Sequence, residues 1–152
     1  MKSCVLHWLL AGSIVLGVPL AHAGDAALPV KLDRAQIAGR AFDSPATVVK
    51  EEQSERGSFT THDLEAFLGS DRKFEAGMYK AGPNRYTISE AYGVDEFMYF
   101  LEGGVKLTSP DGSVIDVHAG EAVIIPRDWR GVWDTDGYTK IYVIYSPEHA
   151  IE

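Results

Sequence analysis

The sequence predicts an all-β fold, a sandwich or a closed barrel, for the second half of the chain. After Arg72, brief apolar or alternating runs follow one another, and turn residues separate them. Short strands at this spacing are typical of sandwiches and barrels. A length of 152 residues suits one domain, and 45% hydrophobic with 24% charged residues is ordinary for a globular protein. Because closing a sheet removes its exposed edges, a barrel with a central cavity is expected.

The first 23 residues have the pattern of a secretory signal peptide. Lys2 precedes an apolar run from Val5 to Leu20, and the small residues Ala21 and Ala23 fit cleavage before Gly24. A retained membrane anchor is the alternative, but the apolar run is short for a span of roughly 20 residues, and Gly and Pro interrupt it. We therefore expect an exported protein, periplasmic or secreted, with no membrane contact after cleavage.

Cleavage would leave an acidic chain without cysteine. Removing 23 of 152 residues takes away one lysine and no acid, so 129 residues remain with 13 basic and 22 acidic side chains and a net charge of −9. The one cysteine, Cys4, lies in the leader, so no disulfide is possible in the mature chain. Nucleic acid is excluded as a partner, because its recognition needs a basic stripe and the Lys and Arg residues here are scattered singly.

Residues 24–73 are expected to form an N-terminal arm, or edge strand, with little helix. One helical turn is expected around Leu32 to Ile37. A short helix is predicted over Thr61 to Leu68, because Asp63 and Glu65 follow a capping-type start and Gly69 ends the segment.

Eight short strands are predicted beyond the arm. They are placed at Phe74–Tyr79, Tyr86–Ala91, Glu96–Leu101, Val105–Thr108, Val114–His118, Ala122–Pro126, Gly131–Asp134 and Ile141–Tyr145. Glycine and proline mark the turns at 103–104, 110–112, 119–120 and 136–137.

Two spacings carry a family resemblance. Glu96 is followed after six residues by Gly103, and Gly120 is followed after five residues by Pro126. In this order they resemble the two cupin motifs. Gly131-x-Trp133 and Lys140-x-Tyr142 resemble the branch that contains the ureidoglycine aminohydrolase cupin domain and the ethanolamine-utilisation cupins. The resemblance implies a cupin domain over residues 74–148, a double-stranded β-helix or jelly-roll barrel; the alternative is that both spacings are strand ends and turns common to many β proteins.

The same resemblance implies an altered metal site. Cupins with a metal carry two histidines just before the motif glutamate and a third after the motif proline, and these places here hold Glu90, Tyr92 and Gly131. The ligands of the ureidoglycine aminohydrolase pattern fall on Glu90, Tyr92, Glu96 and Arg130. Arginine is permanently cationic and cannot coordinate a metal.

Two arrangements of these residues are open. Arg130 could point into the cavity, take the place of the metal charge and pair with Glu90 or Glu96. Alternatively, Glu90, Tyr92 and Glu96 could hold Mn, Fe, Ni or Zn. Each of these charged side chains could instead be a solvated surface charge, with Arg130 on an exposed turn.

Strand periodicity groups the side chains by face. Residues two apart share a face, so Glu90 lies with Tyr92, and Glu96 lies with Met98. The opposite face of the 96–101 strand is also apolar, which predicts that the outside of the barrel packs against a second sheet or a partner subunit. A homodimer is therefore expected.

These observations lead to competing functions. The first is an exported cupin that binds a small molecule in a degenerate, metal-free pocket formed by Glu90, Tyr92, Glu96, Met98, Arg130 and Trp133. Aromatic rings beside an arginine and two carboxylates would suit a small polar, zwitterionic or amine-bearing molecule.

The second is an enzyme. It would be either a metal-dependent hydrolase or lyase on a ureido or amino compound, or a metal-free catalyst with Glu96 or Glu90 as base and Tyr92 as proton donor. The third is a dimerisation module without turnover.

Overall fold

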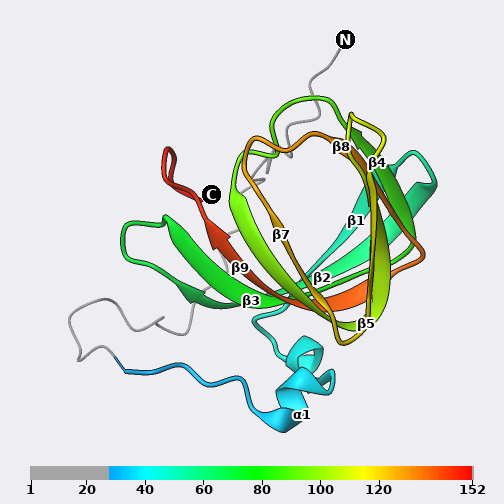
Figure 1. Ribbon diagram of the computed structural model, residues 1–152. Helices are drawn as coiled ribbons and strands as arrows, with labels where there is room; N and C mark the ends of the chain where they lie inside the picture. Colours follow the sequence, from blue (N-terminus) through cyan, green and yellow to red (C-terminus); the bar gives the residue numbers. More distant parts are fainter. Residues whose placement is uncertain (1–27, 152) are drawn as a thin grey trace.

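The computed structural model describes residues 28–151 (Figure 1). The predicted signal peptide and its cleavage point lie outside these residues. The chain forms helix α1 (Arg34–Ile37), the 3-10 helix η1 (Arg40–Asp43), and strands β1 (Val48–Ser54), β2 (Gly57–Leu68), β3 (Phe74–Ala81), β4 (Asn84–Ile88), β5 (Asp95–Thr108), β6 (Val114–His118), β7 (Ala122–Ile125), β8 (Gly131–Thr135) and β9 (Tyr138–Tyr145). In this part of the chain no helix is long and apolar enough to cross a membrane.

The strands form one curled antiparallel sheet. Its order is β1-β2-β3-β9-β5-β8-β4, and β6 and β7 also pair with β5. Figure 1 shows the sheet wrapping round a central space, with β4 and β8 on the far side from β3 and β9. The all-β barrel predicted from the sequence is confirmed.

Strand β5 is the corner of the barrel. Its first half pairs with β9 and β7, and its second half pairs with β6 and β8. The turn predicted at Gly103 and Gly104 is wrong, since the strand runs through both residues. A β-bulge between Phe100 and Glu102 and the positive φ of Gly103 (65°) bend the strand instead. The two glycines therefore join the walls of the barrel.

Large apolar side chains fill much of the interior. Phe59, Met98, Phe100, Val105, Leu107, Val117, Ile125, Trp133, Tyr138 and Tyr142 form one buried cluster. In β5 the residues alternate, so Glu96 and Met98 are buried while Phe97 and Tyr99 are exposed.

The N-terminal segment packs against the outer face of strands β2 and β3. Ala41 of η1 forms a second buried cluster with Leu64 of β2 and Met78 of β3. The helical turn predicted near Leu32 to Ile37 is confirmed as α1, which a capping box of Asp33 and Gln36 begins.

The helix predicted over Thr61 to Leu68 is wrong, because this segment is most of β2. Thr61 and Asp63 pair with the inward positions of β3, whereas Leu64 meets the arm on the outside. Side chains of this segment are buried on both faces and alternate with a period of two, which favours a strand. Pairing with β1 and β3 outweighs the local capping signal, which had predicted a helix.

Replacing Gly104 by alanine tests the corner. A Cβ atom at Gly104 would overlap the Val117 carbonyl oxygen, so we expect Gly104→Ala to lower the free energy of unfolding by more than about 3 kcal/mol or to prevent folding. At Gly82 the nearest atom to an added Cβ lies 3.5 Å away, so Gly82→Ala should cost less than about 1 kcal/mol. Urea unfolding measures both, and equal losses would contradict the role of Gly104.

Candidate functional site

A buried ion pair lies between β5 and β9. The Lys140 ammonium is 2.6 Å from Glu96 Oε1, and the two side chains are only 7% and 4% exposed. Lys140 pairs in register with Phe100, and Glu96 pairs with Ile144, so both residues belong to the inward-facing set of their strands. A charge-assisted contact compensates each group for the water that it loses on burial.

Aromatic rings surround the Lys140 ammonium. Its nitrogen lies 5.5 to 5.9 Å from the centroids of the Tyr79, Trp133, Tyr138 and Tyr142 rings. Met98 Sδ is 3.1 Å from the same nitrogen. Ring faces and a polarizable sulfur attract a cation, so the interior is built to hold a positive charge at this point.

Tyr92 holds the second oxygen of Glu96. Its hydroxyl donates to Glu96 Oε2 at 2.5 Å. The loop that carries it is fixed by a hydrogen bond from the Tyr92 amide to the Trp129 carbonyl and by edge contact of the two rings. Burial and the neighbouring Glu96 carboxylate raise the pKa of Tyr92 well above its ordinary value, so the phenol keeps its proton and remains a donor.

A second polar cluster lies on β2, β3 and β9. The Tyr142 hydroxyl is 2.9 Å from Asp63 Oδ1 and 2.5 Å from Glu75 Oε1. A hydroxyl has one proton and can donate to only one of them, so a proton on the other carboxyl would complete the second hydrogen bond. Burial raises the pKa of Asp63 and of Glu75, which is consistent with one shared proton.

This side of the interior is acidic and reachable from solvent. Glu65 pairs with Gly77 on the inward face and is exposed, and Asp63 beside it is half-buried. Glu52 of β1 pairs with the buried Phe59, and burial raises the pKa of its carboxyl too. On the inner faces of β1, β2, β3, β5 and β9, the described residues include the carboxyl groups of Glu52, Asp63, Glu65, Glu75 and Glu96 and the amines of Lys50 and Lys140.

The structure gathers most of the predicted site residues and separates two of them. Those gathered near the Lys140 ammonium are Tyr92, Glu96, Met98 and Trp133. Glu90 is exposed. Arg130 is also exposed, and its guanidinium donates to the Asp128 carbonyl oxygen at 3.2 Å. The pairing of Arg130 with Glu90 or Glu96 is therefore wrong, and Lys140 supplies the cation beside Glu96.

Sequence reasoning did not identify Lys140 as a site residue. Its signal is the alternation Lys140-x-Tyr142, which places two inward side chains on one strand. The predicted strand began at Ile141, one residue too late to include it.

The interior does not fit a divalent metal in contact with Glu96. Both carboxylate oxygens already bind protein donors, Lys140 on one side and Tyr92 on the other. Across residues 28–151, no group of three or more His, Cys, Asp or Glu side chains is placed to hold a metal ion. A cation at Glu96 would also stand against the Lys140 ammonium, and like charges repel.

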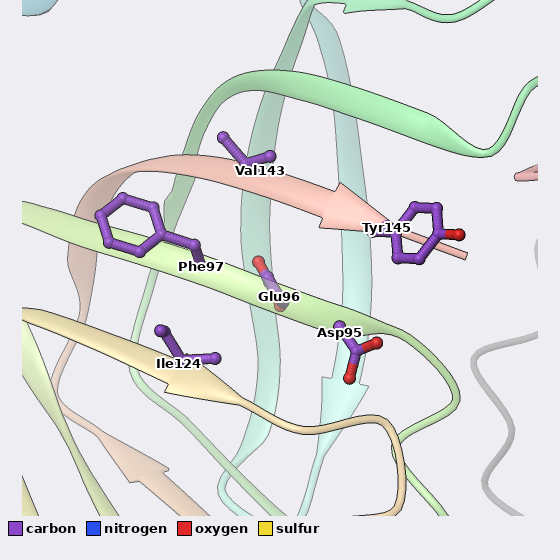
Figure 2. A pocket seen from close by; sticks show the side chains of 6 residues that line it. All are labelled: Asp95, Glu96, Phe97, Ile124, Val143 and Tyr145. Atoms are coloured by element: carbon purple, nitrogen blue, oxygen red, sulfur yellow. The ribbon is translucent and has the colours of Figure 1, made fainter. Parts of the chain in front are cut away.

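The outer face of the same wall is apolar. Figure 2 shows Phe97, Ile124 and Val143 gathered on one side of the strands, while the Glu96 side chain lies partly behind the β5 ribbon. Phe97, Ile124 and Tyr145 are 41%, 66% and 50% exposed and line a shallow depression there. This surface is where the expected homodimer would form, and the homodimer stays a prediction.

Comparison with known proteins identifies the domain. Residues 68–142 match the EutQ-like cupin domain. No curated protein matches. A solved structure of a DUF861 protein of unknown function from Pseudomonas syringae is similar at 17% identity and a TM-score of 0.57, covering 64% of this chain. The match spans 44% of that protein's length.

Two further structures support the same fold. The EutQ protein of Clostridium difficile is 19% identical with a TM-score of 0.52, covering 67% of this chain and 82% of its own. A protein of unknown function from Rhizobium leguminosarum is 22% identical with a TM-score of 0.50, and the match covers 76% of this chain and 98% of that protein. At these identities the likeness establishes the fold alone.

A mutant cycle tests the buried ion pair. Lys140→Met leaves the Glu96 carboxylate buried without its cation, so we expect a loss of about 3 kcal/mol in the free energy of unfolding. The double variant Glu96→Gln/Lys140→Met should recover part of this loss, because no unpaired charge remains. Lys106→Met is the control: its pair with Asp116 is exposed and 3.8 Å long, so less than about 1 kcal/mol is expected in urea unfolding. Equal losses of stability for Lys140→Met and Lys106→Met would show that the buried ion pair matters no more than the exposed one.

The pH dependence of stability tests the shared proton. Because burial raises the pKa of Asp63 and Glu75, the folded chain binds more protons than the unfolded chain above the ordinary carboxyl pKa of about 4. The stability from these groups is fully present below about pH 4 and is lost as pH rises through the raised pKa values. Thermal unfolding of Glu75→Gln should show a smaller loss between pH 4 and 8 than the parent.

The exposed variant Glu90→Gln is the control for this measurement. It should keep the slope of the parent chain. A Glu75→Gln slope that matches the parent would show that Glu75 does not share the proton.

Proposed function

We propose that this chain, whose residues 68–142 match a cupin domain and whose strands form a barrel of the cupin kind, is an exported, metal-free binding protein for a small amine-bearing molecule. The observation that carries the ligand class is the group of carboxyls at Asp63, Glu65 and Glu75, while the Lys140 ammonium beside Glu96 supports the metal-free part of the proposal. In cupins that hold a metal, the barrel interior offers ligands to an ion. Here an amine of the chain itself stands beside the carboxylate.

The charge of the interior supports an amine-bearing ligand. Glu65 is exposed and Asp63 is half-buried, whereas Glu75 is buried and shares the Tyr142 hydroxyl with Asp63. Burial raises the pKa of Asp63 and of Glu75, and the neighbouring carboxyls, Glu65 and Asp63 respectively, raise them further. An incoming ammonium group would relieve this repulsion among the carboxyls. Tyr79 and Tyr142 offer aromatic surface beside them, which suits a cation with a short apolar body.

Matched ligands test this proposal by thermal unfolding. A small amine such as propylamine or putrescine should raise the unfolding midpoint, whereas propanol and propionate at the same concentration should not. Asp63→Asn and Glu75→Gln should weaken the response to the amine, and the exposed Glu90→Gln should leave it unchanged. If no amine and no member of a broad metabolite panel stabilises the protein, the binding proposal fails.

Elemental analysis separates the proposal from its alternative, a metal-dependent hydrolase or lyase acting on a ureido or amino compound. Protein purified without a histidine tag should contain far less than one Mn, Fe, Ni or Zn per chain. A near-stoichiometric metal that Glu96→Gln removes would favour the enzyme.

A further inference from the structure

We propose that a cavity between the N-terminal segment and the outer face of the sheet binds a small zwitterion with an apolar body, of the kind that an aliphatic amino acid represents. The cavity lies on the outer side of the wall that carries Lys140 and Glu96 on its inner side. The inference goes beyond the proposed function, because it assigns a second site, outside the barrel interior.

The cavity has room for a molecule of this size. Its volume is about 390 Å³, and small-molecule sites in proteins typically measure about 300 to 1,000 Å³. Ile37, Gly39 and Phe42 of the α1–η1 segment form one side, and Leu101 of β5 lies with strands β2, β3 and β9 on the other. Figure 1 shows the α1–η1 segment, in blue and cyan, outside the barrel.

One cross-strand row of side chains forms the polar floor of the cavity. His62 of β2 pairs in register with Lys80 of β3, Lys80 pairs with Thr139 of β9, and Thr139 pairs with Glu102 of β5. All four residues line the cavity. Adjacent strands lie about 4.8 Å apart, so the backbone positions of Lys80 and Glu102 are roughly 10 Å apart. Two long side chains at this separation can hold the two charged ends of one small molecule.

The two charges of this row lack partners of opposite sign within the chain. Across residues 28–151, neither Lys80 nor Glu102 forms an ion pair. The Glu102 carboxylate accepts one hydrogen bond, which the Thr139 hydroxyl donates at 3.2 Å. Lys80 therefore has its ammonium available for a ligand carboxylate, and Glu102 has oxygen lone pairs available for a ligand ammonium.

His62 adds an unused hydrogen-bonding group at the Lys80 end of the row. Its Nδ1 is buried and has no hydrogen-bond partner within the described part of the chain. The ring meets Phe42 of the N-terminal segment edge-on, with 6.0 Å between the ring centroids. A buried polar atom without a partner costs free energy, so the imidazole gains by bonding to a ligand. A carboxylate held by Lys80 lies one strand away from His62 and suits an imidazole N–H.

The remaining wall residues narrow the ligand class. Phe42 and Leu101 offer apolar surface, which suits an aliphatic body. Asp43 and Glu102 give the lining two carboxylates against the single ammonium of Lys80, so a ligand without a positive charge would leave them uncompensated. A ligand without a negative charge would likewise leave Lys80 unpaired. A zwitterion with an apolar body matches both ends and the wall between them.

Calorimetric titration with three ligands of one carbon skeleton tests the proposal on the whole chain. Leucine has both charges, isoamylamine lacks the carboxylate and isocaproate lacks the ammonium. Leucine should bind about tenfold more tightly than either, because each missing charge loses one charge-assisted contact. Lys80→Met and Glu102→Gln should each weaken leucine binding by about tenfold or more. Both side chains are exposed, so neither variant should impair folding. Lys106→Met and Glu90→Gln are matched controls at exposed positions that do not line the cavity, and they should bind leucine as the parent does.

The outcomes separate this site from the barrel interior. No binding of leucine, or binding that both Lys80→Met and Glu102→Gln leave unchanged, would overturn the inference. Leucine binding that Glu75→Gln abolishes while Lys80→Met leaves it intact would place the ligand in the interior, which overturns this inference and supports the proposed function. Leucine binding that depends on Lys80 and Glu102, while propylamine and putrescine do not stabilise the protein, would support the outer site and count against the interior one.

Discussion

The ion pair between Lys140 and Glu96 is the interaction on which the rest of the barrel interior depends. Both charges have lost nearly all contact with water, and neither could stay buried without the other. The pair joins β9 to β5, which are neighbours at the centre of the curled sheet. Through its second oxygen, Glu96 also fastens the Tyr92 loop that precedes β5. One carboxylate therefore connects two strands and a loop.

Glycines make this arrangement possible by leaving room where side chains must approach. A Cβ atom at Gly77 would lie 2.2 Å from the Leu64 carbonyl oxygen and 2.8 Å from the Tyr142 hydroxyl, so a larger residue would displace both the β2 backbone and the ring that bridges Asp63 and Glu75. Gly103 and Gly104 do the same for the backbone, since they let β5 cross from one wall to the other. Both the polar interior and the bend in β5 therefore require glycine at these positions.

The sequence predicted the barrel and half of the interior because alternation and turn residues are local signals. Glu96 and Met98 followed from the period of one strand, and the structure places both beside Lys140. Lys140 itself was missed because the start of β9 depends on pairing with β3 and β5, which no local pattern records. The predicted helix at 61–68 failed for the same reason.

Arg130 illustrates a different limit. Its place in the family pattern suggested an inward position, but the side on which a turn residue lies is set by the turn. Trp129 donates its amide to Pro126 and packs against the core cluster, so the next residue, Arg130, faces solvent. The positive charge inside the barrel is a side chain of the chain itself. Because it is covalently part of the chain, neither chelators nor a scarcity of metal ions can remove it.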